Sequence, residues 1–226
     1  MNRKLVVVTG AAGALGSAIS GHLSQAGWTV AGVDVGTQRG EGNAFSVFHA
    51  GTDLTDDRTA AEAMKRIHTE LGPMSALLNI AGGFAWETIL DGSPNTWDEM
   101  YTRNVKSCLI SCQRAIPFFS ENGGAILNVS AEASRKAGLG MGAYAASKSG
   151  VSRLTEALSE ELKDKAIRVN AVLPTIIDTP ANREEMPDED HQKWVRTDEL
   201  AQIAEYLIGP GASAINGVQL TVRGRM

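Results

Sequence analysis

The feature that most restricts the fold is a glycine-rich segment that directly follows a short apolar run. Residues 5–8 are Leu, Val, Val and Val, and Gly10, Gly13 and Gly16 follow at intervals of three. A helix-like stretch, 15–26, comes next, so the glycines lie between an expected strand and an expected helix. Glycines at such a junction let backbone N–H groups and the positive end of a helix approach a phosphate closely. The segment predicts a phosphate-binding loop, and a tight structural turn is the alternative.

The same alternation of apolar runs and helix-like stretches continues along the chain. Short, mostly β-branched runs predict strands at 5–9, 29–33, 76–80, 125–129, 168–173 and 218–222. The stretches between them predict helices at 15–26, 58–71, 97–118, 143–164 and 198–207, with Asp198 as the expected N-cap of the last. Strands that alternate with helices form a parallel sheet covered on both faces, so we expect an α/β fold. Because no repeat, low-complexity tract or proline-rich linker interrupts it, residues 1–226 are expected to form a single domain.

Composition narrows the classes of function. The 226 residues include 21 Lys and Arg against 26 Asp and Glu, a net charge of −5, and 43% are hydrophobic. This balance does not create the broad positive field that nucleic-acid backbones require, so no nucleic-acid partner is expected. Only four apolar residues lie between Lys4 and Thr9, too few for a signal peptide or a membrane span. We therefore expect a cytoplasmic protein without a membrane partner.

Cysteine and histidine usage argues against disulfide and metal sites. Cys108 and Cys112 are the only cysteines, and their spacing places both on one expected helix as small buried side chains. The four histidines are scattered without the spacing of zinc ligands. No metal site is predicted.

An acidic residue follows the second expected strand. Asp34 stands eighteen positions after the last glycine of the loop, where its carboxylate can accept hydrogen bonds from the ribose hydroxyls of an adenosine. The same charge would repel the 2′-phosphate of NADP. Neither Gly13 nor Val35 offers a basic side chain to offset this repulsion, although Arg39 follows shortly and could do so. The segment favours NAD(H) over NADP(H).

A tyrosine and a lysine stand four residues apart near the start of an expected long helix. Tyr144 and Lys148 therefore project from one face, about 5 to 6 Å apart at Cβ. The lysine charge and an oxidised nicotinamide ring would lower the pKa of the phenol from its usual value of about 10. Together with the glycine loop, the pair predicts that Tyr144 is a general acid for reduction. An ordinary solvated pair on a helix is the alternative.

The region 175–196 breaks the alternation of strands and helices. It is polar, contains Pro180 and Pro187, and carries a cluster of charged residues at 183–190. A connection of this length favours a mobile substrate lid over a passive link.

Together, these residues make the chain resemble the short-chain dehydrogenase/reductase family over essentially its whole length. The matching motifs, in chain order, are Thr9, Gly10 and Gly16, Asp34, Asp53 and Leu54, 79–82, Asn104, 128–130, Tyr144 and Lys148, 168–170, and 173–174. The resemblance implies a Rossmann-like, doubly wound parallel sheet flanked by helices, and hydride transfer to or from nicotinamide C4. It also implies that Tyr144 is the acid/base, that Lys148 holds the nicotinamide ribose, and that Asn104 kinks a helix and orders a water relay to Lys148.

The resemblance also assigns residues to the cofactor. They are Gly10, Gly13, Ala14, Leu15 and Gly16 in the glycine loop, Asp34, Asp53 and Leu54 near the adenosine, Asn79, Ala81 and Gly82 after a central strand, Tyr144 and Lys148, and Pro174, Ile177 and Thr179. Thr179, with residues 176–177, would hold the nicotinamide carboxamide. Asp53 is an adenine contact under the resemblance, whereas its local sequence is equally compatible with a helix N-cap.

Two positions depart from the usual pattern of the family. Ala14 stands where most members have the middle glycine, and its methyl group is small enough to keep cofactor binding. Ala131 stands thirteen residues before Tyr144, where the family usually has a catalytic serine. Ser130 is adjacent, but successive strand residues point to opposite faces, and Ser134 would have to swing in from a loop. A missing donor to a substrate carbonyl costs about 3 kcal/mol in related acyl chemistry, so ordinary ketone reduction should suffer.

Both departures fit one branch of the family. The sequence is similar to dihydropteridine reductases, in which an alanine stands at the serine position. The most specific part of this resemblance lies in residues 173–194. Those enzymes use NADH to reduce quinonoid dihydropterin, whose conjugated imine accepts hydride readily, so one tyrosine proton donor suffices. Trp86 would then line the substrate pocket with Ala131 and Tyr144, or it packs at the edge of the core instead. Asn104 belongs to the wider family and not to this branch.

Two other functions remain open from the sequence. One is a reductase or dehydrogenase of another carbonyl, imine or alcohol. The other is a non-catalytic NAD(H)-binding protein, although a pure binder would not need Tyr144, Lys148 and Asn104 together.

The resemblance implies a homodimer or homotetramer assembled through the two long expected helices, 97–118 and 143–164. Apolar residues on these helices are candidates for the interface or, equally, for the core. They are Ile110, Phe118, Val151 and Leu158.

Overall fold

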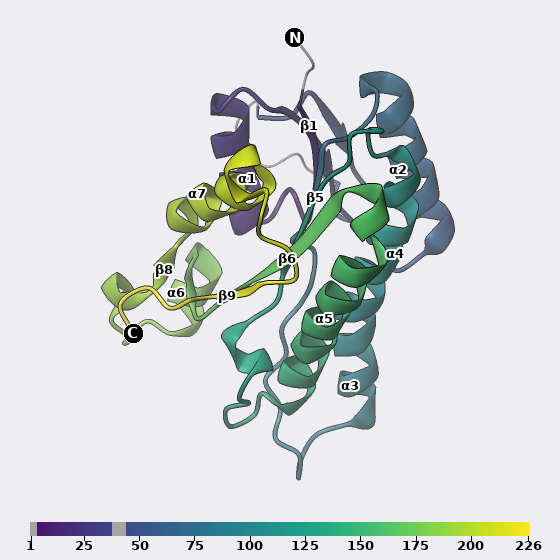
Figure 1. The fold of residues 1–226 in the computed structure, drawn as a ribbon. Helices are drawn as coiled ribbons and strands as arrows, with labels where there is room; N and C mark the ends of the chain where they lie inside the picture. The colour runs from purple at the N-terminus through teal and green to yellow at the C-terminus, as the bar shows by residue number, and fades with distance from the viewer. Residues whose placement is uncertain (1–3, 38–43) are drawn as a thin grey trace.

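A seven-stranded parallel sheet forms the centre of the protein, as a computed structural model shows (Figure 1). The structure describes residues 4–37 and 44–226, so Arg39 lies outside the described residues. The strands are β1 (Leu5–Thr9), β2 (Thr29–Val33), β3 (Val47–His49), β4 (Ala76–Asn79), β5 (Gly124–Val129), β6 (Ile167–Pro174) and β9 (Gln219–Val222). Their order, β3-β2-β1-β4-β5-β6-β9, reverses direction between β1 and β4. The predicted Rossmann-like single-domain fold is confirmed.

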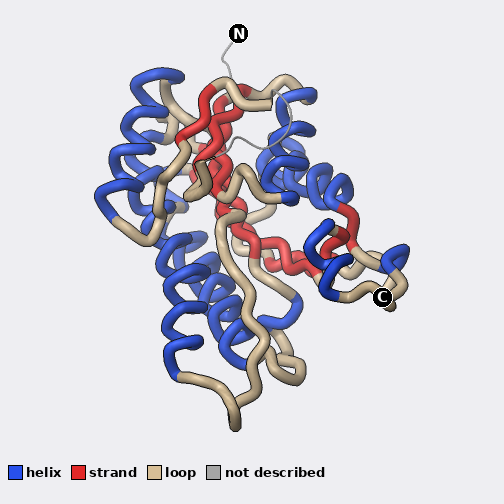
Figure 2. Tube along the Cα trace, turned by 180° about the vertical axis from the view of Figure 1, so that it is seen from behind, coloured by secondary structure: helices blue, strands red, loops and turns tan. Residues whose placement is uncertain are grey.

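Helices cover both faces of the sheet (Figures 1 and 2). One face is covered by α1 (Ala14–Gln25) and α7 (Thr197–Ile208), and the other by α2 (Asp57–Leu71), α4 (Ser107–Ala115) and α5 (Gly142–Glu161). Alternate strand residues point to opposite faces, so neighbours in one strand join different cores. Val7 and Leu77 pack toward α2, α4 and α5, whereas Val8 and Leu78 pack toward α1 and α7. The doubly wound arrangement thus buries both faces of every central strand.

The predicted strands agree with the structure to within one or two residues, but β3 was not predicted. This three-residue edge strand is only half-buried, so it carries no apolar run that a sequence pattern can detect. The region 175–196 is also more regular than expected. It contains β7 (Ile177–Asp178), α6 (Pro180–Glu185), a 3₁₀ turn (His191–Lys193) and β8 (Val195–Arg196), and it lies beside the C-terminus in Figure 1.

The prediction of a single helix at 97–118 is wrong in detail. The segment comprises α3 (Pro94–Met100), a π-helical turn (Tyr101–Lys106), α4 and a 3₁₀ turn (Ile116–Phe118). α3 begins three residues early because Ser93 caps it, its hydroxyl accepting the Asn95 N–H at 3.2 Å. The π-helical turn places Asn104 at the interruption.

The expected N-cap of α7 is corrected, and the cap alternative for Asp53 is excluded. Asp198 is not the N-cap of α7, because Arg196 occupies that position and Glu199 accepts its backbone N–H at 3.0 Å. Asp198 instead contacts the Arg196 guanidinium at 2.9 Å from the first turn. Asp53 does not cap α2, because Asp56 does so, with its carboxylate accepting a backbone N–H of the first turn at 2.8 Å.

The apolar residues considered for an oligomer interface belong to the core. Ile110, Val151 and Leu158 are buried between the helices and the sheet, and Phe118 packs against the same cluster. Cys108 and Cys112 are free and buried, as expected. Within residues 4–37 and 44–226, no helix combines the length and apolar character needed to cross a membrane.

Candidate active site

A large cleft lies at the carboxyl ends of the strands, where the strand order reverses. Its volume is about 1430 Å³, beyond the roughly 300–1,000 Å³ of most small-ligand pockets, so it can hold a dinucleotide and a second molecule. Most residues predicted for the site line it: Gly10, Gly13, Ala14, Leu15, Gly16, Asp34, Asp53, Leu54, Ala81, Gly82, Trp86, Ala131, Tyr144, Lys148, Pro174, Ile177 and Thr179. Asn79 and Asn104 do not line the cleft.

The glycine loop between β1 and α1 is closely packed. Gly10 has φ of +62°, and a Cβ there would lie 2.8 Å from the Ala81 nitrogen. A Cβ on Gly16 would lie 2.1 Å from the Gly10 carbonyl oxygen, so both positions exclude larger residues. Gly13, the N-cap of α1, has no side chain to cap the helix. The first turn of α1 therefore presents its positive end to the cleft without a competing side chain, as phosphate binding requires.

Asp34 holds the turn that follows β2. Its Oδ2 accepts the Ala12 N–H at 2.8 Å, and its Oδ1 accepts the Gly36 N–H at 2.7 Å. Each carboxylate oxygen has a further lone pair, so the side chain can still accept hydrogen bonds from ribose hydroxyls. The contact with Ala12 also ties the carboxylate to the glycine loop.

Tyr144 and Lys148 lie one turn apart on α5 and both face the cleft. The Lys148 ammonium donates a hydrogen bond to the Val129 carbonyl at 2.9 Å and lies 5.9 Å from the centroid of the Tyr144 ring. The Phe84 ring contacts Tyr144 edge-on, with 4.9 Å between ring centroids. The phenol is thus packed between an aromatic wall and the lysine.

Burial dominates the ionisation of this pair. It raises the pKa of Tyr144 to about 12 and lowers the pKa of Lys148 to about 8. The sequence predicted that the lysine charge and an oxidised nicotinamide ring together lower the pKa of the phenol; the lysine alone, 5.9 Å from the ring centroid, does not offset the desolvation of the phenolate. At neutral pH the phenol keeps its proton and Lys148 is mostly charged.

Asn104 lies behind the cleft in the π-helical turn. Its Oδ1 accepts the Gly83 N–H at 2.9 Å, and its Nδ2 donates to the Gly83 carbonyl at 3.0 Å and to Ser147 Oγ at 2.9 Å. It makes no direct hydrogen bond to Lys148. A Cβ on Gly82 would lie 2.5 Å from Asn104 Oδ1 and 3.4 Å from Lys148 Nζ, so this glycine allows the close approach. Asn104 therefore links the loop after β4 to α5.

Asn79 is placed differently from the expectation that it lies along a cofactor. Its Nδ2 donates to Asn128 Oδ1 at 2.9 Å and contacts Cys112 Sγ at 3.2 Å. Asn128 in turn donates to Thr155 on α5 at 2.9 Å. The side chain of Asn79 therefore joins β4 and β5 to the helices beneath the site.

Neither Ser130 nor Ser134 offers a free hydroxyl in place of the one missing at Ala131. The Ser130 hydroxyl is buried, donates to the Lys148 carbonyl at 2.8 Å and contacts Ser152 at 3.0 Å. Ser134 accepts a hydrogen bond from Ser152 at 3.4 Å and does not line the cleft. Ala131 itself is buried and lines the cleft.

Several lining residues were not predicted from the sequence. Phe84, Arg103, Glu132, Lys136 and Met141 also line the cleft. Among them, only Phe84 could have been predicted from the sequence, because it is an aromatic residue directly after Gly82 and Gly83 and close to Trp86. Trp86 lines the cleft with 59% of its surface exposed, and a Cβ on Gly140 would lie 2.2 Å from its ring. Its side chain is therefore a wall of the cleft, not a part of the core edge.

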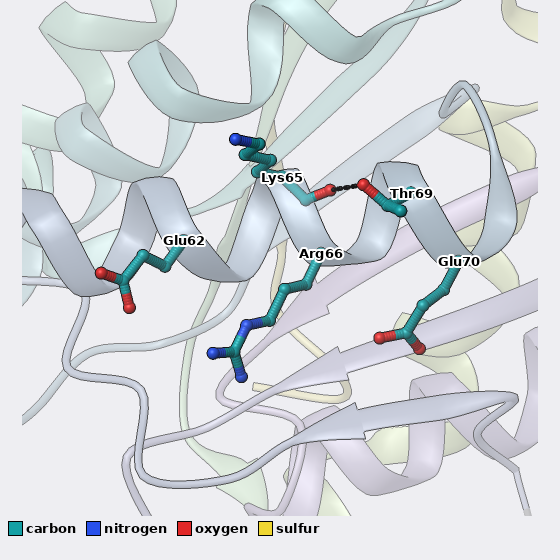
Figure 3. Close-up of a pocket in the computed structure, with 5 residues that line it drawn as sticks. All are labelled: Glu62, Lys65, Arg66, Thr69 and Glu70. Atoms are coloured by element: carbon teal, nitrogen blue, oxygen red, sulfur yellow. Dashed lines mark hydrogen bonds between the residues drawn. The ribbon is translucent and has the colours of Figure 1, made fainter.

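A second, smaller hollow of about 300 Å³ lies on the outer face of α2 (Figure 3). It is lined only by Glu62, Lys65, Arg66, Thr69 and Glu70, and Thr69 Oγ1 donates to the Lys65 carbonyl at 2.9 Å. All five residues come from one helix and none belongs to the site above. We regard it as solvated helix surface.

Comparison with known proteins agrees with this geometry. The family model described as short chain dehydrogenase matches residues 4–190. Nodulation protein G of Azospirillum brasilense is 31% identical over 243 residues, with 99% of this chain and 98% of that protein covered. The 4-formylbenzenesulfonate dehydrogenase of Comamonas testosteroni is 29% identical over 249 residues, with the same coverage of 99% and 98%.

The fold is also shared with solved structures. A short-chain type dehydrogenase/reductase from Mycobacterium ulcerans superimposes with a TM-score of 0.89 at 21% identity, covering 98% of this chain and 89% of that chain. The family match spans most of the chain, and the glycine loop, Tyr144 and Lys148 occupy one cleft. The chain therefore belongs to the short-chain dehydrogenase/reductase family of NAD(P)-dependent oxidoreductases.

Proposed function

We propose that the protein is an NAD(H)-dependent reductase of a small conjugated substrate, in the manner of dihydropteridine reductases. The observation that carries this proposal is Ala131, a buried methyl group that lines the cleft near Tyr144 where a hydroxyl donor is usual. Without that donor the site stabilises a developing alkoxide poorly. A quinonoid imine, already part of an electron-poor ring, needs only a proton from Tyr144.

The cleft fits a nicotinamide dinucleotide. The glycine loop and the first turn of α1 would bind the pyrophosphate, Asp34 the adenosine ribose, and Asp53 and Leu54 the adenine. The carboxylate of Asp34 favours NAD(H), because a 2′-phosphate would meet its negative charge. When bound, the cofactor supplies the hydride and, in its oxidised form, a positive charge near the phenol.

We assign the proton to Tyr144. Burial keeps the phenol protonated at neutral pH, so it can donate to the substrate during reduction. Lys148, whose charge is retained below pH of about 8, would hold the nicotinamide ribose and stabilise the phenolate that remains. Asn104 would complete a path for protons to Lys148 through ordered water in the space near Gly82.

The substrate would occupy the end of the cleft lined by Trp86, Ala131 and Tyr144. Region 175–196 contributes Ile177 and Thr179 to the cofactor side, and we propose that it closes as a substrate lid. Pro174, at the end of β6, would begin this covering segment.

A second candidate function is the oxidation or reduction of an aldehyde or alcohol. It is favoured by the similarity to the 4-formylbenzenesulfonate dehydrogenase, a relative that matches over nearly the whole chain. Ala131 argues against this function, because it offers no hydroxyl and so leaves Tyr144 as the donor to a substrate carbonyl oxygen.

We further propose that the protein assembles as a homodimer or homotetramer. Trp97 and Tyr101, on α3 and the π-helical turn, are 43% and 57% exposed, an unusual position for large aromatic side chains unless they meet a partner. Light scattering coupled to size exclusion tests this, and a monomer at micromolar concentration would contradict it.

The proposed reaction is tested by mixing the purified protein with NADH and freshly made quinonoid dihydropterin and following absorbance. A panel of aldehydes and ketones is assayed in parallel. Faster turnover of the pterin supports the first candidate. Fast turnover of ketones with no pterin activity would replace it with the second.

A further inference from the structure

Three cationic side chains line the cleft, and one of them has no charged or hydrogen-bonding partner among residues 4–37 and 44–226. The Lys148 ammonium donates to the Val129 carbonyl at 2.9 Å, and Arg103 pairs with Glu99 at 3.0 Å. Lys136 also lines the cleft and is exposed, but its ammonium forms no ion pair or hydrogen bond with any residue that the structure describes. Its charge is therefore available to a ligand.

The nearest carboxylate along this loop does not neutralise Lys136. Glu132 Oε1 contacts the Arg223 guanidinium at 2.5 Å, and its Oε2 is buried. Arg223 thus compensates the charge of Glu132 from the end of β9. Glu185, on α6, also lines the cleft and is the carboxylate that could compete for Lys136 when the lid moves.

Two aromatic side chains line the same cleft as this charge. Phe84 and Trp86 are 49% and 59% exposed although they line a cleft, and the Phe84 ring touches Tyr144. The loop that carries Trp86 is joined to the loop that carries Lys136, because the Glu87 N–H donates to the Gly140 carbonyl at 2.8 Å. The same Gly140 lies against the Trp86 ring. The two aromatic rings, the Tyr144 phenol and the Lys136 ammonium therefore line one cleft, and a backbone hydrogen bond joins the loops that carry Trp86 and Lys136.

We propose that the substrate carries a carboxylate or similar anionic group on a flat conjugated ring, and that Lys136 binds this group. The proposal rests on the proposed function and names its substrate class. Aromatic stacking orients a flat ring without selecting its substituents, whereas a cation distinguishes an anionic substituent from a neutral one of the same shape. Lys136 is thus a specificity-determining residue.

The test compares two ligands of the same shape and different charge. 4-(Hydroxymethyl)benzoate and 4-(hydroxymethyl)benzamide are titrated calorimetrically into the enzyme–NADH complex, where ligand and cofactor are both reduced and no turnover occurs. We expect the benzoate to bind about two- to fivefold tighter at low salt, with the ratio falling toward one at high salt, because an exposed pair is weak and screened. Lys136→Gln should abolish the ratio and leave the affinity for the benzamide unchanged.

Lys165→Gln is the matched control. Lys165 is exposed and lies in the 3₁₀ turn before β6, at the opposite edge of the sheet, so the variant changes the net charge equally. It should keep the preference for the benzoate. If Lys136 serves only to latch the lid through Glu185, then Lys136→Gln and Glu185→Gln will weaken both ligands alike, which overturns the proposal.

Equal affinities for the two ligands in the unmodified protein would also overturn it. The binding assay tests the role of Lys136 and the turnover assay tests the proposed function, so each can fail without the other. A preference for the benzoate without turnover of any pterin or carbonyl contradicts the proposed function, whereas turnover without any preference for charge contradicts only the role of Lys136.

Discussion

At the scale of single residues, the chemistry depends on what stands at position 131. Ala131 supplies a methyl group to the cleft, and the nearby serine hydroxyls are engaged elsewhere. We expect Ala131→Ser to raise ketone reduction about a hundredfold, since one well-placed donor is worth about 3 kcal/mol in the transition state. Steady-state kinetics with a small ketone measure this, and an unchanged rate would mean that another group already stabilises the oxygen.

The preference for NADH over NADPH is expected to depend on one residue, Asp34. Asp34→Ala removes the charge that opposes a 2′-phosphate, so the ratio of kcat/KM for NADH to that for NADPH should fall about tenfold or more. Part of the loss of NADH affinity will come from the turn that Asp34 holds through Ala12 and Gly36. Asp34→Asn removes the negative charge but keeps most of these contacts, so it separates the effect of the charge from the effect of the turn. If neither variant changes the ratio, the ribose assignment is wrong.

The ionisation of Lys148 predicts a pH dependence. Its pKa is lowered to about 8 by burial, so its charge is present below that pH and lost above it. The Tyr144 phenol, with a pKa of about 12, stays protonated through this range. The value of kcat/KM for NADH should therefore fall as pH rises through about 8. A profile that stays flat to pH 10 would contradict the need for a charged lysine.

At the scale of elements, the site depends on where helices begin, break and end. The glycine loop and the paired Tyr144 and Lys148 are local patterns, so the sequence alone could predict them. The family resemblance implied a helix kink at Asn104, but no local pattern predicts its π-helical turn or the short strand β3, because each is stabilised by contacts with distant segments. The side-chain partners of Asn79 could not be predicted for the same reason, since they lie on β5 and α4.

The end of α7 offers a test at this scale. The Arg168 guanidinium, on β6, donates to the carbonyls of Leu207 and Gly209 at 2.9 and 3.2 Å and to Ile215 at 3.1 Å. We expect Arg168→Leu to lower the free energy of unfolding by about 2–4 kcal/mol, because buried carbonyls lose a charged donor. Chemical denaturation measures it. The exposed pair of Arg153 supplies the control, since Arg153→Leu should change stability by less than about 1 kcal/mol.

At the scale of the whole molecule, a parallel sheet brings distant segments to one edge. The alternating apolar runs were sufficient to predict the sheet, its helices and the edge at which the cleft lies. They could not predict which loops meet there, and Lys136, Glu132 and Arg223 are examples. The Glu132–Arg223 pair joins residues 91 positions apart, and no local pattern encodes such a contact.

The central claim is that Tyr144 gives a proton to a substrate held beside a bound nicotinamide. Tyr144→Phe removes the phenolic oxygen and keeps the ring that packs against Phe84. The most direct measurement is kcat of this variant together with its dissociation constant for NADH. We predict a loss of turnover of a hundredfold or more, as expected for a general acid, with NADH affinity within about twofold. Turnover equal to that of the unmodified protein would contradict the account.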